Sequence, residues 1–175
     1  MDFYDSLKYV LQFEGGFVDD PTDHGGATNK GITQVVYDSF KVKNNRSLQS
    51  VKNIENGEVE NIYKEEYWDI CHCDGIRSPI NLLVFDSAIQ HGPQRAIKWL
   101  QSVLKTTIDG FCGDNTLYAL NDLLFTSTVD NIIQQYIQIR ENFYKKIIEN
   151  DPSQKRFENG WKNRMTKLKE ILKEG

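Results

Sequence analysis

Glu14 places a charged side chain within an apolar helical pattern. Phe3, Leu7 and Val10 have the spacing of one helix face, and Glu14 follows Val10 by four residues, so the pattern puts its carboxyl on that face. Because an ionised carboxylate is costly to remove from water, a half-buried Glu would hold its proton near neutral pH. Such a proton donor is what a general acid requires. The alternative is that Glu14 points into solvent at a fraying helix end.

The segment after Glu14 contains the other candidate acidic groups. Residues 15–33 are rich in Gly, Asp and Thr, which predicts a long loop or an irregular hairpin. A loop of this length in a compact domain is usually functional. Asp20 before Pro21 is typical of a turn, and Asp19 is equally consistent with a solvated side chain. Asp23 is the remaining acidic residue of the segment.

The remaining elements are predicted to be helical, because strand-like alternation is nearly absent. The first helix is expected at residues 2–14, and the others at 33–42, 57–69, 80–92, 94–105, 115–124, 129–150 and 161–172. The expected fold class is mainly α, with a possible small hairpin after Glu14. The segment 80–92 is apolar on nearly every face, so it is predicted to be a central buried helix. Its polar residues Asp86, Gln90 and His91 must find partners or face a cleft; for Asp86 we favour a structural role, such as bonding loop backbone.

Composition and charge narrow the class of protein. A chain of 175 residues can form one globular domain or two small lobes with a shared core. Its net charge of −4, with both signs mixed along the chain, argues against a nucleic-acid-binding protein. No apolar stretch is long enough to span a bilayer, and no secretory signal is visible at the N-terminus. We therefore expect no membrane insertion and accumulation in the cytoplasm.

The three cysteines do not form a recognisable metal or disulfide pattern. Cys71-His72-Cys73 lacks the usual zinc spacing, and Cys112 is far downstream. The sequence thus favours reduced thiols.

The glycine-containing pairs Gly25-Gly26 and Lys30-Gly31 match neither dinucleotide nor P-loop fingerprints, so nucleotide binding is not expected. We expect no metal and no organic cofactor.

Several motifs together resemble a known enzyme family. Glu14-Gly15-Gly16-Phe17-Val18-Asp19-Asp20-Pro21, continuing as Asp23-His24-Gly25-Gly26-Ala27-Thr28-Asn29-Lys30-Gly31-Ile32-Thr33, resembles the opening of glycoside hydrolase family 108, the lysozyme-like N-acetylmuramidases of bacteria and their phages. The resemblance continues through Tyr67-Trp68, Phe85-Asp86-Ser87-Ala88, His91-Gly92-Pro93, Ala96-Ile97-Lys98-Trp99-Leu100-Gln101, Asp109-Gly110-Phe111-Cys112-Gly113 and Gly160-Trp161-Lys162-Asn163-Arg164. It implies a lysozyme-like catalytic region at residues 1–92 and a helical, peptidoglycan-binding-like region at residues 93–175, packed as one body.

The resemblance also implies an activity and its residues. Glu14 would be the general acid that cleaves the β-1,4 bond between N-acetylmuramic acid and N-acetylglucosamine in peptidoglycan glycan strands. Asp23 and Thr28 would hold a water or stabilise positive charge, and whether the reaction inverts or retains is open. The expected substrate-binding residues are Gly26, Thr33, Tyr67, Gln90 and His91. A holin pore or an export system would release the protein from the cytoplasm to the periplasm or cell wall. The alternatives are a lytic transglycosylase and a non-catalytic wall-binding or secretion-accessory protein.

Overall fold

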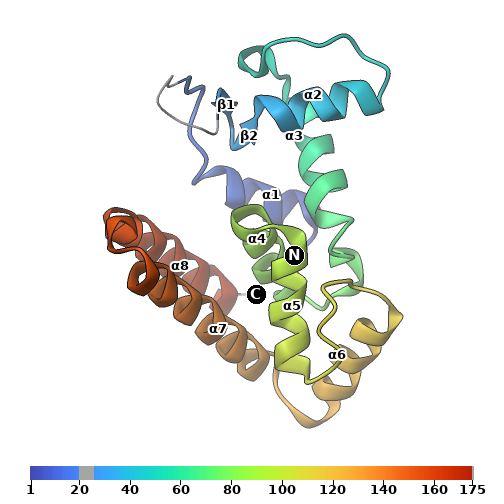
Figure 1. Ribbon diagram of the computed structural model, residues 1–175. Helices are drawn as coiled ribbons and strands as arrows, with labels where there is room; N and C mark the ends of the chain where they lie inside the picture. The colour runs from blue at the N-terminus through green and yellow to red at the C-terminus, as the bar shows by residue number, and fades with distance from the viewer. Residues whose placement is uncertain (20–25, 175) are drawn as a thin grey trace. The chain divides into compact units, whose positions relative to one another are not determined.

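The chain forms two compact, mainly helical units. The computed structural model describes residues 1–19 and 26–174. Contacts within the chain separate an N-terminal unit, residues 3–66, from a C-terminal unit, residues 1–2 and 67–175. Helices dominate both units (Figure 1), which confirms the predicted fold class. The two compact units divide between Glu66 and Tyr67. The expected boundary between the catalytic and the peptidoglycan-binding-like regions lies elsewhere, between residues 92 and 93, and it stays a prediction.

The N-terminal unit combines short helices with one small hairpin. Its elements are α1 (Phe3–Leu11), β1 (Thr28–Asn29), β2 (Ile32–Thr33), α2 (Gln34–Lys43), the 3-10 helix η1 (Val51–Asn53) and α3 (Asn56–Tyr63). A π-helical turn, η2 (Lys64–Trp68), follows α3. β1 and β2 pair antiparallel, with Asn29 opposite Ile32. The hairpin predicted after Glu14 is therefore present.

A buried carboxylate joins α2 to α3. Glu58 on α3 accepts hydrogen bonds from Lys41 Nζ (2.6 Å) and from the Tyr37 hydroxyl (2.5 Å), both on α2. Burial alone would raise the pKa of Glu58, but these hydrogen bonds outweigh it and hold the pKa at about 2. The carboxylate is thus ionised and paired at neutral pH, and it fixes the two helices together.

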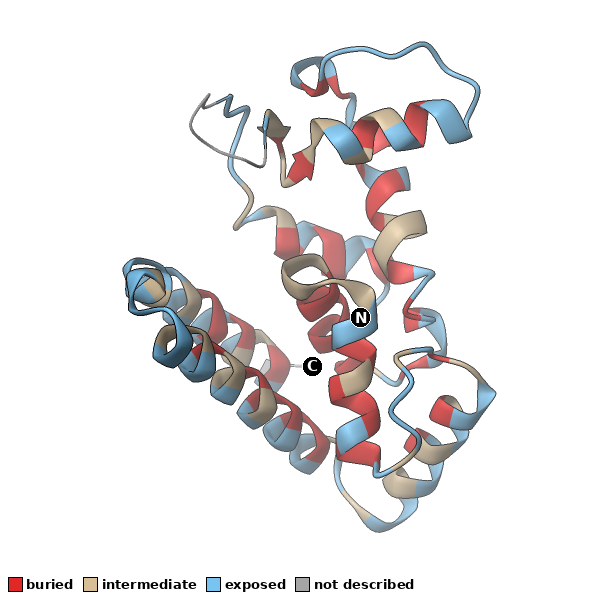
Figure 2. Ribbon diagram, in the orientation of Figure 1, coloured by how far each residue is buried: buried red, intermediate tan, exposed pale blue. Residues whose placement is uncertain are grey.

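The C-terminal unit is a set of packed helices. Its elements are the 3-10 helix η3 (Cys73–Gly75), α4 (Ile80–His91), α5 (Pro93–Leu104), α6 (Asp114–Thr126), α7 (Val129–Asn150), the 3-10 helix η4 (Pro152–Phe157) and α8 (Glu158–Glu174). The segment from Ile80 to Ala88 is buried at every position (Figure 2), which confirms that α4 is a central helix. Pro93 begins α5 in its first turn, where a missing N–H costs nothing.

Asp86 joins α4 to two later helices. Arg140 on α7 donates from Nη1 to Asp86 Oδ2 (2.6 Å), and Arg164 on α8 has Nη2 2.8 Å from Asp86 Oδ1. Burial alone would raise the pKa of Asp86, but the two guanidinium groups outweigh it and lower the pKa. The predicted structural role is confirmed, but the suggested partners were wrong. Asp86 pairs with arginines rather than loop backbone, and their positive charges offset the cost of burying the carboxylate.

Over residues 1–19 and 26–174, no helix is both long and apolar enough to span a membrane.

Candidate active site

Glu14 lies outside the first helix, contrary to the sequence prediction. α1 ends at Leu11, and the last bonds at this end run from Gln12 N to Tyr9 O and from Phe13 N to Val10 O. The helix stops early because the following backbone pairs with the hairpin instead. Gly15 O accepts from Lys30 N at 3.1 Å. Glu14 is nevertheless half-buried, as the helical pattern suggested.

The hairpin turn depends on two residues in the left-handed region. Lys30 has φ +50° and Gly31 has φ +76°, the sign pattern of a type I′ turn, whose twist matches that of paired strands. The buried Asn29 side chain anchors the hairpin, because its Nδ2 donates to the carbonyls of Val51 and Lys52 at 3.1 and 3.2 Å. Residues outside the turn therefore hold it in place.

The carboxyl of Glu14 and the hydroxyl of Tyr63 converge on Gly31. A Cβ atom added at Gly31 would lie 2.6 Å from Glu14 Oε2 and 2.5 Å from the Tyr63 hydroxyl oxygen. Both distances are shorter than any ordinary contact, so only glycine lets the turn approach this closely. The Tyr63 hydroxyl donates to Lys30 O at 2.8 Å. The hairpin turn thus lies close to the Glu14 carboxyl, and Tyr63 of α3 holds that turn.

A groove of about 480 Å³ opens beside Glu14 in the N-terminal unit. Lys30 Nζ donates to Asn56 Oδ1 (2.5 Å) at its margin. The groove is lined by Leu11, Glu14, Gly15, Gly16, Lys30, Asn56, Val59 and Glu60. Of its two carboxyl groups, Glu14 is half-buried and Glu60 is exposed. This arrangement presents a carboxyl group to a ligand and shields that group partly from water.

Comparisons with known proteins identify the family of the chain. The family described as Glycosyl hydrolase 108 matches residues 7–92, and the family described as Predicted Peptidoglycan domain matches residues 95–166. A solved structure entitled "Structure of Brucella abortus SagA" is 30% identical, with a TM-score of 0.79; the match covers 97% of this chain and 92% of that one. No curated protein matches the sequence.

The chain belongs to glycosyl hydrolase family 108. It has the mainly α, lysozyme-like fold that the sequence predicts, and it is a glycoside hydrolase that acts on peptidoglycan. The N-terminal unit contains Glu14 and its groove, both within the range of the family 108 match. The C-terminal unit contains the whole peptidoglycan-domain match.

The other residues predicted from the family 108 resemblance have varied surroundings. Gly26, Thr28 and Thr33 do not line the groove. The Thr28 hydroxyl donates to Gly26 O at 3.3 Å, and the Thr33 hydroxyl caps α2 by accepting from Val36 N at 3.4 Å. Asp23 lies outside the described residues. The roles assigned to these four residues in the family 108 reaction stay predictions.

Tyr67, Gln90 and His91 belong to the C-terminal unit and are half-buried. His91 Nε2 lies 2.9 Å from the Tyr144 hydroxyl oxygen. Burial and the nearby Arg140 lower the pKa of His91 to about 3, so its ring is neutral at pH 7 and does not act as an acid there. The assignment of the three residues to substrate binding stays a prediction.

The cysteines are all free and buried. Burial raises the pKa of Cys112 to about 11 and places that of Cys73 well above its usual value, so both thiols are protonated at neutral pH. Metal ligation requires a thiolate. No group of three His, Cys, Asp or Glu side chains within residues 1–19 and 26–174 is arranged to hold a metal ion.

Gly31 and Tyr63 are functional candidates that the sequence analysis missed. The signal for Gly31 was the Lys30-Gly31 pair between two short segments, which is typical of a tight hairpin turn. Tyr63 gave no such signal, because an aromatic residue at helical spacing is usually part of the core. Its contact with the turn joins Lys30 and Tyr63, which are separated by 33 positions in the sequence.

Proposed function

We propose that the protein is an N-acetylmuramidase that hydrolyses the β-1,4 bond between N-acetylmuramic acid and N-acetylglucosamine, with Glu14 as the general acid. The observation that carries the proposal is the half-buried Glu14 carboxyl in the wall of the groove, close to the backbone of Gly31. An acid in a glycosidase must reach the leaving oxygen while its own orientation stays fixed. The contacts at Gly31 supply that restraint.

Asp23 and Thr28 are the proposed partners of Glu14 in this reaction. A muramidase needs a group that activates water or stabilises the oxocarbenium-like transition state. Asp23 and Thr28 both follow Glu14 in the motif that resembles family 108, and Thr28 is the first residue of β1, which supports their assignment. A holin pore or an export system is the proposed route by which the protein reaches the wall.

The Glu14→Gln variant tests the acid. Gln keeps the shape of the side chain but cannot donate a carboxyl proton, so we expect the release of fragments from purified peptidoglycan to fall by about 100-fold or more. Glu60→Gln is the matched control, because Glu60 is the other carboxylate that lines the groove. We expect this variant to release fragments less than about ten-fold more slowly than wild type, since an exposed carboxylate at the groove contributes contacts rather than the proton. Equal activity of Glu14→Gln and wild type would refute the assignment.

The mass of the products tests the reaction type. A muramidase adds water, so its fragments carry a free reducing end. A lytic transglycosylase closes an anhydro ring and gives fragments lighter by one water. Mass spectrometry of the released fragments should show hydrated products only; anhydro products would replace the hydrolase proposal with the transglycosylase.

A further inference from the structure

A second groove lies between α7 and α8 in the C-terminal unit. Its volume is about 400 Å³. It is lined by Glu141, Tyr144, Lys145, Ile148, Glu158, Trp161, Lys162, Met165, Thr166 and Lys169. All of these except Lys169 fall within the range that matches the peptidoglycan domain. The groove lies in a different unit from Glu14, so it is a separate candidate binding site.

The floor of this α7–α8 groove is aromatic and apolar. The rings of Tyr144 and Trp161 stack at 4.8 Å with an interplanar angle of 14°. Phe157 packs near Trp161 at 6.2 Å, with its ring tilted by 38°. Tyr144 is held in turn by Arg140, whose Nε donates to its hydroxyl at 3.0 Å. The stacking of Tyr144 and the nearby Phe157 therefore cover part of the Trp161 ring.

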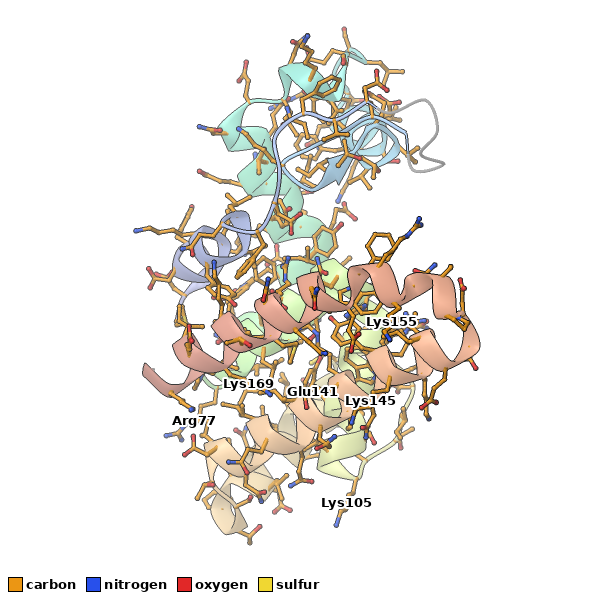
Figure 3. The ribbon with its side chains drawn as sticks, turned by 90° about the vertical axis from the view of Figure 1, so that its left-hand side faces the viewer. Arg77, Lys105, Glu141, Lys145, Lys155 and Lys169 are labelled. Carbon is orange, nitrogen blue, oxygen red and sulfur yellow. The ribbon has the colours of Figure 1, made fainter. Side chains whose placement is uncertain are left out.

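The rim of the groove carries both signs of charge. Lys169 Nζ lies 2.5 Å from Glu141 Oε1, and Lys162 Nζ lies 2.7 Å from Glu158 Oε1. Lys145 is exposed, one helical turn after Glu141 (Figure 3), and has no ion pair with any residue the structure describes. Two ion pairs and one further ammonium group leave the rim with a net positive charge. The chain as a whole is negative, at −4, so this excess is local.

We propose that the α7–α8 groove binds the peptide stem of peptidoglycan, with Lys145 contacting one of its carboxylates. The inference relies on peptidoglycan as the substrate but not on Glu14 as the acid. A stem peptide carries several free carboxylates and, before cross-linking, an amine on its diamino acid, so it complements a rim with both signs of charge and an excess ammonium. Its aliphatic side chains suit the apolar floor.

The glycan strand fits the same groove less well. Sugar rings bind proteins by laying their C–H faces on aromatic rings, and the stacking of Tyr144 on Trp161 leaves less ring surface for a sugar. Where the stem peptide is attached, it is joined by an amide bond to the lactyl carboxyl of N-acetylmuramic acid, so the sugars themselves are uncharged and the charged rim would lose water without gaining ionic partners. The chemistry of the groove therefore favours the peptide over the glycan.

The test is direct binding of two soluble probes by calorimetry. The first probe is a stem tripeptide with free carboxylates, and the second is a chitin oligosaccharide without peptide. We expect the wild-type chain to bind the tripeptide, and Lys145→Glu to bind it about ten-fold more weakly, because repulsion replaces an attraction. Lys146→Glu is the matched control. It makes the same charge change at the next residue, which is exposed but does not line the groove, and its affinity should stay within about two-fold of wild type.

The outcomes separate this inference from the proposed muramidase activity. If Lys145→Glu and Lys146→Glu lose the same affinity for the tripeptide, the groove assignment is overturned. It is also overturned if neither substitution changes that affinity. Preference of the chain for the peptide-free oligosaccharide, with that preference lost in Lys145→Glu, would assign the groove to glycan instead. Because calorimetry with the tripeptide requires no hydrolysis, the groove can be supported even if Glu14→Gln proves fully active, and the reverse also holds.

Discussion

Gly31 determines how closely the hairpin turn approaches the carboxyl of Glu14. Its φ of +76° is a conformation that costs a residue with a side chain about 1–3 kcal/mol, and an added Cβ would also collide with Glu14 and Tyr63. We expect Gly31→Ala to reduce the rate of peptidoglycan hydrolysis about 10- to 100-fold, since small displacements of a catalytic group have effects of this size. Fragment release at saturating substrate measures the rate.

Gly92→Ala separates the collision from the backbone strain. Gly92 has φ +85°, also in the region that favours glycine, but an added Cβ would have no atom within 4 Å. This variant should lose free energy of unfolding, measured in urea, and keep most of the rate. If both variants lose the same rate, backbone strain alone explains the effect, and the contact with Glu14 has no role.

At the scale of elements, helices are held together by charges buried between them. Asp86 connects α4 to α7 and α8 through Arg140 and Arg164. Asp86→Asn would leave both guanidinium groups in the interior without a counter-charge. We expect it to lower the free energy of unfolding by about 3–5 kcal/mol, as measured by urea denaturation.

An exposed ion pair on α8 provides the comparison for Asp86. Glu158 and Lys162 are four residues apart on the helix, and the Lys162 side chain is 67% exposed. Glu158→Gln makes the same change from carboxylate to amide and should cost less than about 1 kcal/mol. A similar cost for the two variants would contradict the view that burial makes the Asp86 contacts important.

At the scale of the whole molecule, both units contain groups that make the fold sensitive to acid. His91 in the C-terminal unit has a pKa of about 3 instead of 6.5, and Glu58 in the N-terminal unit has a pKa of about 2 instead of 4.5. In each case the unfolded chain binds the proton at a higher pH than the folded chain. The free energy of unfolding should therefore fall as the pH drops from 6.5 toward 3 through His91, and from 4.5 toward 2 through Glu58.

Urea denaturation at a series of pH values measures this decline. One group contributes a slope of at most about 1.4 kcal/mol per pH unit. His91→Gln should flatten the plot of unfolding free energy against pH between pH 6.5 and 4.5. The decline below pH 4.5 should remain, because there Glu58 takes up a proton in the unfolded chain but not yet in the folded one. An unchanged slope above pH 4.5 in this variant would show that His91 is not the group responsible.

Local patterns in the sequence were sufficient for most of the helices. The segment 129–150 was predicted with the bounds that α7 has, and α4 was predicted as a central buried helix. Hydrophobic periodicity and the Gly92-Pro93 break are properties of neighbouring residues, so a single chain reveals them. The motif that begins at Glu14 likewise identified the family and the residue proposed as the acid.

Only the tertiary structure decided where α1 ends and what surrounds Glu14. The helical pattern continues to Glu14, but pairing of Gly15 with Lys30 ends the helix at Leu11. The convergence of Tyr63 on Gly31 joins segments about 30 residues apart, and Asp86 pairs with arginines 54 and 78 residues away. Such contacts depend on how distant segments pack. The sequence by itself therefore determined the helices and the candidate acid, whereas the fold decided how that acid is held.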